Sequence, residues 1–319
     1  MQPSSASHPL AAFPTCRESR AARYRSVTDG FFAGALAGAL AESVVHPFDT
    51  ISVRLKMQLK PPFKYAGIWD CARVVLAEEG VRGLYAGVGA TLISALPTNA
   101  VYFATYEAAK HVASSLDSSG STDARGWSRS SWVYAAAGVA SELTSSLVYV
   151  PFEVIKTRLQ TGRPVNAVYG DSKLRSPPVY RGALHGFAQI VRREGARGLY
   201  AGWGACIATD CCYSALLFVT YEELRRREVQ PLVAGSAAGA AAALLSNPFE
   251  VVTTRQMIAP RGAAGATASA VARALLHEEG WRGLWKGALA RAATHAPNAA
   301  LMFAAYEGTR HLIESMRRA

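Results

Sequence analysis

Three short phrases decide the fold of this chain: Pro47-Phe48-Asp49, Pro151-Phe152-Glu153 and Pro248-Phe249-Glu250. They lie about one hundred residues apart, and each closes a long apolar segment. Copies at a regular interval indicate structural repeats. We therefore predict three repeats at 28–114, 130–228 and 229–319, with an N-terminal tail at 1–27 and a linker at 115–129.

The composition is that of a membrane protein. Hydrophobic residues make up 50% of the 319 residues and charged residues only 18%, which is a low charged share for a soluble protein of this size. Charge-free stretches such as 83–105 and 229–249 reach the roughly 20 residues with which a helix crosses a bilayer. These stretches also carry Ser, Thr or Asn, which indicates helices of a bundle with one wet face.

Other features argue against several protein classes. The chain has no Walker A lysine motif, no GxGxxG after a strand and no GxSxG elbow, so we expect no enzymatic activity and no cofactor. Its five cysteines lack zinc spacing, which argues against a metal centre. The net charge of +11 comes without an aromatic-interleaved basic patch, so it favours anionic lipid headgroups over nucleic acid as partners.

The N-terminal tail is basic. Arg17, Arg20, Arg23 and Arg25 stand against a single acid, Glu18, among Ser, Pro and Ala. Such a stretch is typical of an organelle transit peptide. A disordered tail explains the pattern equally well, and both interpretations stay open.

Each repeat has the same order of elements. A first apolar helix ends at the Pro-x-acid phrase, where the proline removes a backbone hydrogen bond and kinks the helix. An amphipathic segment then ends in Glu-Gly, and a second apolar helix ends in Tyr-Glu. We therefore predict an all-α membrane protein with six transmembrane helices and three short surface helices. A soluble helical solenoid would also show repeats, but it does not explain the charge-free spans.

Two motifs connect this pattern to a known family. Repeat 2 carries Pro151, Glu153, Lys156 and Arg158, with Gln160 two residues on, and repeat 3 carries Glu279-Gly280 followed by Trp285-Lys286-Gly287. With these motifs the chain resembles the mitochondrial carrier family over residues 28–314. The resemblance implies a pseudo-threefold, multi-pass bundle in the mitochondrial inner membrane, monomeric, with alternating access around one central site.

The resemblance also implies an ion-pair ring on each side of that site. The cytosolic gate would consist of Tyr106, Glu107, Lys110, Tyr221, Glu222, Arg225, Tyr306, Glu307 and Arg310. Its pairs would be Lys110 with Glu222, Arg225 with Glu307, and Arg310 with Glu107. The matrix gate would consist of Pro47, Asp49, Pro151, Glu153, Lys156, Gln160, Pro248 and Glu250.

The matrix gate is incomplete in the sequence. The position of Lys156 is Ser52 in repeat 1 and Thr253 in repeat 3. We therefore expect one ion pair, Asp49 with Lys156, and hydrogen bonds from Ser52 and Thr253 to the other acids. This predicts a matrix gate weaker than the cytosolic one, and a substrate-free carrier that favours the matrix-open state. Arg54, Lys56 or Arg255 re-pairing the acids is the alternative.

The substrate site is predicted from broken symmetry. A closing ring needs threefold equality, whereas one asymmetric substrate does not, so polar residues without equivalents in the other repeats are candidates. They are Glu42, Glu142, Asp210, Arg291 and His295. Thr209 joins them because the family resemblance implies substrate contacts at its level. Charges within a membrane are expensive and mark function by default. Three acids against one arginine favour a cationic or zwitterionic centre, with an ammonium at Asp210 or Glu142 and a carboxylate at Arg291.

Within the family, Glu42, Glu142 and the stretch 96–100 are most similar to S-adenosylmethionine carriers. Those carriers have an arginine-acid pair where this chain has Thr209-Asp210, which leaves the substrate open. We expect antiport of a small metabolite of the S-adenosylmethionine or amino-acid kind. A mitoferrin-like metal-ion carrier, a proton-leak protein and a scaffold without transport are the alternatives.

Lipid sites are expected at helix N-termini, whose free amide groups bind phosphate. The glycines that open the surface helices or the second apolar helices mark them: Gly67, Gly87, Gly182, Gly202 and Gly287. The family resemblance makes cardiolipin the expected partner.

Overall fold

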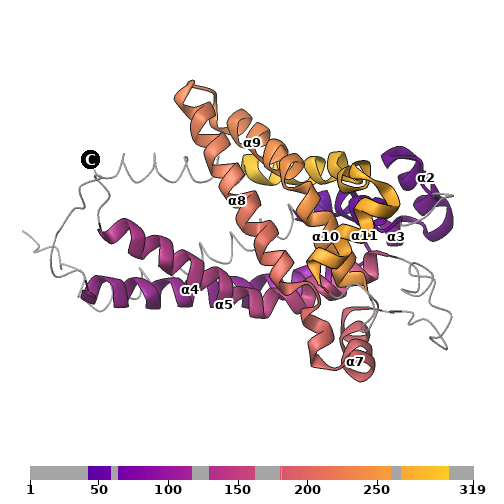
Figure 1. Ribbon diagram of the computed structural model, residues 1–319, viewed down its shortest axis with the longest axis horizontal. Coiled ribbons are helices and arrows are strands. Elements are labelled where there is room, and N and C mark those ends of the chain that lie inside the picture. The colour runs from indigo at the N-terminus through magenta and orange to yellow at the C-terminus, as the bar shows by residue number, and fades with distance from the viewer. Residues whose placement is uncertain are drawn as a thin grey trace, which may run out of the picture. The chain divides into compact units, whose positions relative to one another are not determined.

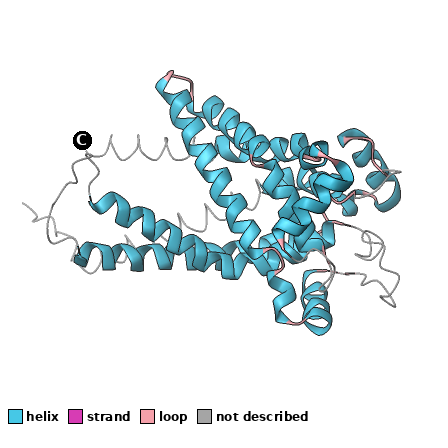
Figure 2. Ribbon diagram, in the orientation of Figure 1, coloured by secondary structure: helices cyan, strands magenta, loops and turns pink. Residues whose placement is uncertain are grey.

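The computed structural model describes residues 42–58, 64–116, 129–161, 180, 182–259 and 267–301, without the side chains of 110–116 and 129–136. The chain divides into two units, 1–40 and 41–319, and all described residues lie in the second. These residues form helices, 3-10 turns and short loops, and no strand occurs among them (Figure 2).

The order of helices repeats three times, as predicted (Figure 1). Repeat 1 contains a helix over 42–56, α2 (Ile68–Glu79), α3 (Val81–Leu84) and α4 (Val88–Leu116). Repeat 2 contains α5 (Arg129–Gln160), α7 (Ala183–Glu194), η1 (Ala196–Tyr200) and α8 (Trp203–Arg226). Repeat 3 contains α9 (Pro231–Leu245), α10 (Asn247–Ile258), α11 (Ala268–Glu279), η2 (Trp281–Trp285) and a helix over 288–301.

Two of the described helical stretches, Val81–Ala109 and Ala196–Arg226, are long and apolar enough to cross a membrane. The pair α9 and α10 meets the same test together, although it bends by 62° between its halves. The break lies at Ser246, two residues before Pro248, and Pro248 lacks the backbone N–H that a continuous helix needs. The total of six spans stays a prediction.

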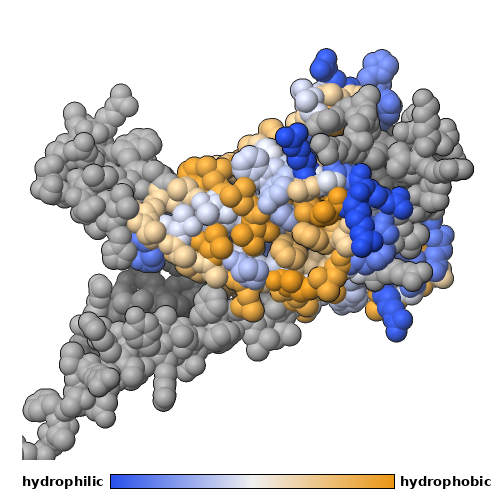
Figure 3. All heavy atoms as spheres, turned by 90° about the horizontal axis from the view of Figure 1, so that it is seen from below, coloured by the Kyte–Doolittle hydropathy of each residue, from blue (hydrophilic) through white to orange (hydrophobic). Residues whose placement is uncertain are grey.

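The surface agrees with a bilayer environment. Large apolar side chains such as Phe218, Val219 and Leu289 are more than half exposed. Figure 3 shows apolar atoms over the middle of one face, with hydrophilic atoms gathered toward the end at which α2 and α11 lie. A soluble monomer rarely exposes large contiguous apolar patches.

Three equivalent arginines join the repeats at the end marked by the Pro-x-acid phrases. Each lies seven residues after its proline, is buried, and donates Nε–H to a carbonyl in the last turn of another repeat's first helix. The contacts are Arg54 to Gln160 at 3.0 Å, Arg158 to Met257 at 2.9 Å and Arg255 to Lys56 at 3.0 Å. Because every repeat gives one such bond and receives one, the three helix ends form a closed cycle.

The same arginines bind the acid of the Glu-Gly stop in their own repeat. The donor–acceptor distances are 2.6 Å for Arg54 with Glu79, 2.9 Å for Arg158 with Glu194 and 2.8 Å for Arg255 with Glu279. Each guanidinium therefore fixes a surface helix to a first helix and to the next repeat. Arg54 and Arg158 bind their glutamates with both Nη atoms, and this bidentate geometry is the strong form of the arginine–carboxylate contact.

Glycine allows the second helix of each repeat to begin against a neighbouring repeat. Gly87 has φ +87°, and a Cβ there would lie 3.0 Å from the Lys156 carbonyl oxygen. Gly287 has φ +73°, and its Cβ would lie 2.8 Å from the Ser52 carbonyl oxygen. Only glycine combines this left-handed backbone with so close an approach.

Candidate functional site

The predicted pair Lys156 with Asp49 is present in the ring of acids at the Pro-x-acid end. Lys156 Nζ lies 2.9 Å from Asp49 Oδ2 and 3.5 Å from Glu153 Oε1. Gln160 Nε2 donates to the same Asp49 oxygen at 2.9 Å. Repeat 2 therefore supplies both a charge and a neutral brace to the acid of repeat 1.

The expectation of a single ion pair is wrong. Lys56 Nζ lies 3.1 Å from Glu250 Oε1, so repeat 1 pairs with repeat 3 as well. Lys56 stands nine residues after its proline, the position that Gln160 holds in repeat 2. This equivalence was the signal in the sequence, because a long side chain at that position reaches the acid of a neighbouring repeat.

Contrary to expectation, the two hydroxyl residues of the ring bind backbone carbonyls and no acid among the described residues. Ser52 donates to the Gly287 carbonyl at 3.2 Å, and Thr253 donates to the Phe249 carbonyl at 3.0 Å. Both hydroxyls satisfy backbone groups instead. Within the described part of the chain, Glu153 receives no ion pair from repeat 3, so its cation is Lys156 of its own helix, which Asp49 shares.

Thr209 lies in a helix contact. Its hydroxyl donates to the Ala205 carbonyl at 2.8 Å and lies 2.9 Å from the Thr253 hydroxyl. Since it is 1% exposed, Thr209 connects α8 to α10. A direct contact with a substrate would require these helices to separate.

Asp210 is held by a residue that the sequence argument missed. Tyr149, two residues before Pro151, donates its hydroxyl to Asp210 Oδ2 at 2.5 Å. Cys206 lies on the same carboxylate, with Sγ 3.7 Å from Oδ2. Glu142 lies on α5, seven residues before Tyr149, and is half-buried. Two predicted acids are therefore placed on neighbouring helices, α8 and α5.

The Arg291 guanidinium is engaged with other protein groups and does not offer a binding site for a substrate carboxylate. Its Nη1 donates to the Ala243 carbonyl at 2.8 Å and to Ser246 Oγ at 2.7 Å. Its Nη2 lies 4.0 Å from Glu250 Oε2. The guanidinium therefore binds a carbonyl of the last turn of α9, next to the bend between α9 and α10. We correct the expected role: Arg291 supports the bent helix and the ring.

His295 belongs to the same packed group. Its ring centroid lies 4.6 Å from that of Tyr213, with the planes tilted by 46°. The Arg291 guanidinium lies 5.6 Å from the centre of the Tyr213 ring. A cation over an aromatic face is attracted by the ring quadrupole. The Tyr213 ring therefore contacts both Arg291 and His295.

Comparison with known proteins decides the family. The family model described as mitochondrial carrier protein matches residues 24–116, 128–230 and 226–317. The chain belongs to the mitochondrial carrier family. Members of this family are transporters and not enzymes.

Relatives in the mitochondrial carrier family differ in cargo. Mitochondrial magnesium exporter 1 of Drosophila melanogaster is 33% identical over 89% of this chain and 94% of its own length. Probable S-adenosylmethionine carrier 2, chloroplastic, of Arabidopsis thaliana is 29% identical over 91% and 75%. Tricarboxylate transport protein A, mitochondrial, of Danio rerio is 29% identical over 90% and 78%. Overall similarity therefore supports a mitochondrial membrane carrier without choosing its substrate.

The predicted cytosolic gate of this carrier lies partly outside the described residues. The Lys110 side chain, Tyr306, Glu307 and Arg310 are among the parts not described. Of the others, Tyr221 is buried, Glu222 is exposed, and Arg225 donates to the Val229 carbonyl at 2.7 Å. The three pairs of this gate stay a prediction.

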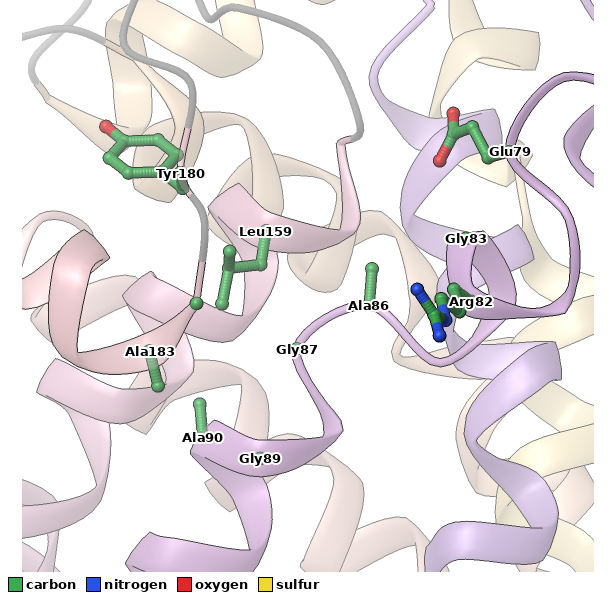
Figure 4. A pocket seen from close by; sticks show the side chains of 11 residues that line it. Glu79, Arg82, Gly83, Ala86, Gly87, Gly89, Ala90, Leu159, Tyr180 and Ala183 are labelled. Atoms are coloured by element: carbon green, nitrogen blue, oxygen red, sulfur yellow. The ribbon is translucent and has the colours of Figure 1, made fainter.

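Four of the five glycines expected to mark lipid sites line pockets. Gly87 and Gly182 face a pocket of about 420 Å³ together with Arg82, Leu159 and Ala183 (Figure 4). Gly67 and Gly287 line a second pocket of about 490 Å³, with Trp69, Trp285 and Lys286. Each pocket thus combines glycines at helix starts with one basic side chain. Gly202 instead lies against repeat 3, where its Cβ would come within 3.2 Å of Gln256 Cβ.

Proposed function

We propose that this carrier moves a small solute with a cationic centre across the mitochondrial inner membrane by alternating access, in exchange for a second solute. The observation that supports the cationic centre is an excess of acid. The described ring and site candidates contain six acids: Glu42, Asp49, Glu142, Glu153, Asp210 and Glu250. They contain three basic side chains, Lys56, Lys156 and Arg291. The formal charge is therefore 3 − 6, or −3, with the histidines neutral.

The contacts of the three cations sharpen this preference. Lys56 and Lys156 are engaged with Glu250 and Asp49, and Arg291 is engaged with the backbone at Ala243. None of them is presented as a binding group for an anion. A carboxylate on the substrate was expected to bind Arg291, and that part of the expectation loses its support.

Asp210 and Glu142 are the groups we propose for the cation. They lie on neighbouring helices, and neither forms an ion pair among the described residues. Tyr149 orients the Asp210 carboxylate through its hydroxyl. A cationic ligand between two carboxylates gains electrostatic energy. That energy shifts a two-state carrier from one state to the other only if the ligand binds one of the two states better. S-adenosylmethionine, which a relative is named for carrying, has such a centre.

The test is ligand-induced stabilisation of the purified protein. We expect S-adenosylmethionine or another organic cation to raise the unfolding temperature, because a ligand at about 100 times its Kd adds about 2.7 kcal/mol to the free energy of unfolding. Citrate and ATP should leave it unchanged. Asp210→Asn should abolish the shift, whereas Glu223→Gln, an exposed acid on the same helix, should preserve it. Stabilisation by the anions alone would overturn the proposal.

We also propose that the two glycine-lined pockets hold the phosphates of anionic lipid, with cardiolipin as the expected species. The helices α2 and α7 begin next to Gly67 and Gly182, so free backbone amides lie beside each pocket. Arg82 adds positive charge to the first pocket, which Glu79 also lines, and Lys286, which pairs with Glu279, adds positive charge to the second. Native mass spectrometry with cardiolipin and with phosphatidylcholine would test this, and equal retention of both lipids would contradict it.

A further inference from the structure

Next to the ring lies a cluster of three possible metal ligands, one of which, His46, has no role in the proposed transport of a cationic solute. Glu42, His46 and Asp49 follow one another at spacings of four and three residues on the helix 42–56. That spacing places them on one helix face. One donor atom from each residue lies within 4.8 Å of the other two. A single bound ion could therefore contact all three.

The hydrogen bonding of His46 leaves one ring nitrogen available as a ligand. His46 is fully buried, and its Nε2 lies 3.0 Å from the Ala86 carbonyl oxygen. A carbonyl only accepts, so Nε2 carries the hydrogen and Nδ1 of the neutral ring keeps its lone pair. Among the described residues, no hydrogen-bond partner contacts Nδ1.

A buried acceptor without a partner needs an explanation, because such groups are rare in native proteins. Metal-binding histidines show the same arrangement: one ring N–H donates to a carbonyl, which fixes the tautomer and directs the other nitrogen at the ion. His46 combines full burial, a fixed tautomer and two carboxylates within reach.

We propose that Glu42, His46 and Asp49 bind a divalent transition-metal ion in competition with Lys156. One imidazole with two carboxylates suits ions of the Fe²⁺, Co²⁺ and Zn²⁺ class. Mg²⁺ prefers oxygen ligands and retains water, so it should bind more weakly. This inference goes beyond the proposed solute transport and does not depend on the identity of the solute.

Competition follows from the position of the Lys156 ammonium. Nζ lies 2.9 Å from Asp49 and 3.9 Å from Glu42, so it occupies the carboxylates that the ion needs. A metal ion bound to the same carboxylates would lie close to the Lys156 ammonium, and the two positive charges would repel each other. Lys156 has a second acceptor, Glu153, at 3.5 Å. Loading of the ion therefore moves Lys156 to Glu153 and removes the ion pair between repeats 1 and 2.

Calorimetric titration of the full-length protein in detergent with CoCl₂, and separately with MgCl₂, tests the site. We expect one Co²⁺ per chain, bound more tightly than Mg²⁺. His46→Gln should weaken Co²⁺ binding by about 10-fold or more, the range seen when the support of a metal site is damaged. The matched control is His277→Gln, an exposed histidine at the end of α11, which should bind like the wild type.

Two further variants keep the outcome interpretable. Lys156→Gln removes the competing ammonium and should tighten Co²⁺ binding by about 10-fold, a gain that misfolding cannot produce. Glu42→Gln should weaken it. Equal Co²⁺ affinity in His46→Gln and His277→Gln would overturn the site, and unchanged affinity in Lys156→Gln would overturn the competition. Neither measurement requires transport, so failure of the solute proposal would be seen separately.

Discussion

The three arginine–glutamate pairs provide an internal comparison for the energetics of the fold. The pairs are equivalent by sequence but differ in burial: the acid side chain is 30% exposed at Glu79, 15% at Glu194 and 4% at Glu279. Glu279 also binds Lys286 Nζ at 2.6 Å. We predict that Glu→Gln substitutions destabilise the protein in the order Glu279, Glu194, Glu79.

The magnitudes follow from burial. Removing one member of a buried ion pair costs about 3–5 kcal/mol, because the other charge stays buried without compensation. We expect this range for Glu279→Gln, which leaves Arg255 at 4% exposure. For Glu79→Gln we expect about 1–3 kcal/mol, the value of a hydrogen bond to a charged group, since water reaches that site. At about 2 °C per kcal/mol for a chain of this length, the unfolding temperature should fall by roughly 6–10 °C and 2–6 °C.

The assay is thermal unfolding in one detergent at one scan rate, since apparent midpoints of irreversible unfolding depend on the rate. Glu223→Gln is the control. It removes an exposed pair with Arg227 at 2.8 Å, and exposed pairs contribute at most about 1 kcal/mol. A loss at Glu79 as large as that at Glu279 would refute the reasoning that burial ranks the three sites.

Two further predictions concern packing and thiol chemistry. Gly287→Ala should lower the free energy of unfolding by about 2 kcal/mol or more, because the new Cβ would lie 2.8 Å from the Ser52 carbonyl oxygen in a left-handed backbone. Thermal unfolding would compare it with Gly204→Ala, whose Cβ meets no described atom within 4 Å and which should be neutral or slightly stabilising. Burial raises the pKa of Cys71 to about 11, so at pH 8 it should remain a thiol and resist maleimide until the protein unfolds; rapid labelling at pH 8, seen by peptide mass spectrometry, would contradict this.

The order of elements could be predicted from the sequence because glycine and proline mark where the helices begin, end and bend. Each Glu-Gly ends a surface helix, and Gly87 and Gly287 open second helices where a Cβ would strike the next repeat. These features depend on local backbone geometry, and a glycine in the sequence indicates where that geometry occurs. The bend between α9 and α10 follows from Pro248 in the same way.

The pairing of charges could be predicted only in part, because it depends on how far a long side chain reaches across repeats. Asp49 with Lys156 followed from the motif. Lys56 reaches Glu250 from a position where the motif has glutamine, and Arg291 turns toward the backbone at the helix bend. His46 carried no sequence signal, since its tautomer is set by a carbonyl forty residues away.

Charge selectivity of exchange tests the central proposal most directly. The full-length protein would be reconstituted into liposomes, and uptake of radiolabelled S-adenosylmethionine, a basic amino acid and citrate measured with and without internal unlabelled solute. We expect uptake of a cationic solute that requires internal solute and falls to the level of empty liposomes in Asp210→Asn, with none for citrate. Uptake of citrate alone, or exchange of no solute in a panel that spans both charges, would contradict it.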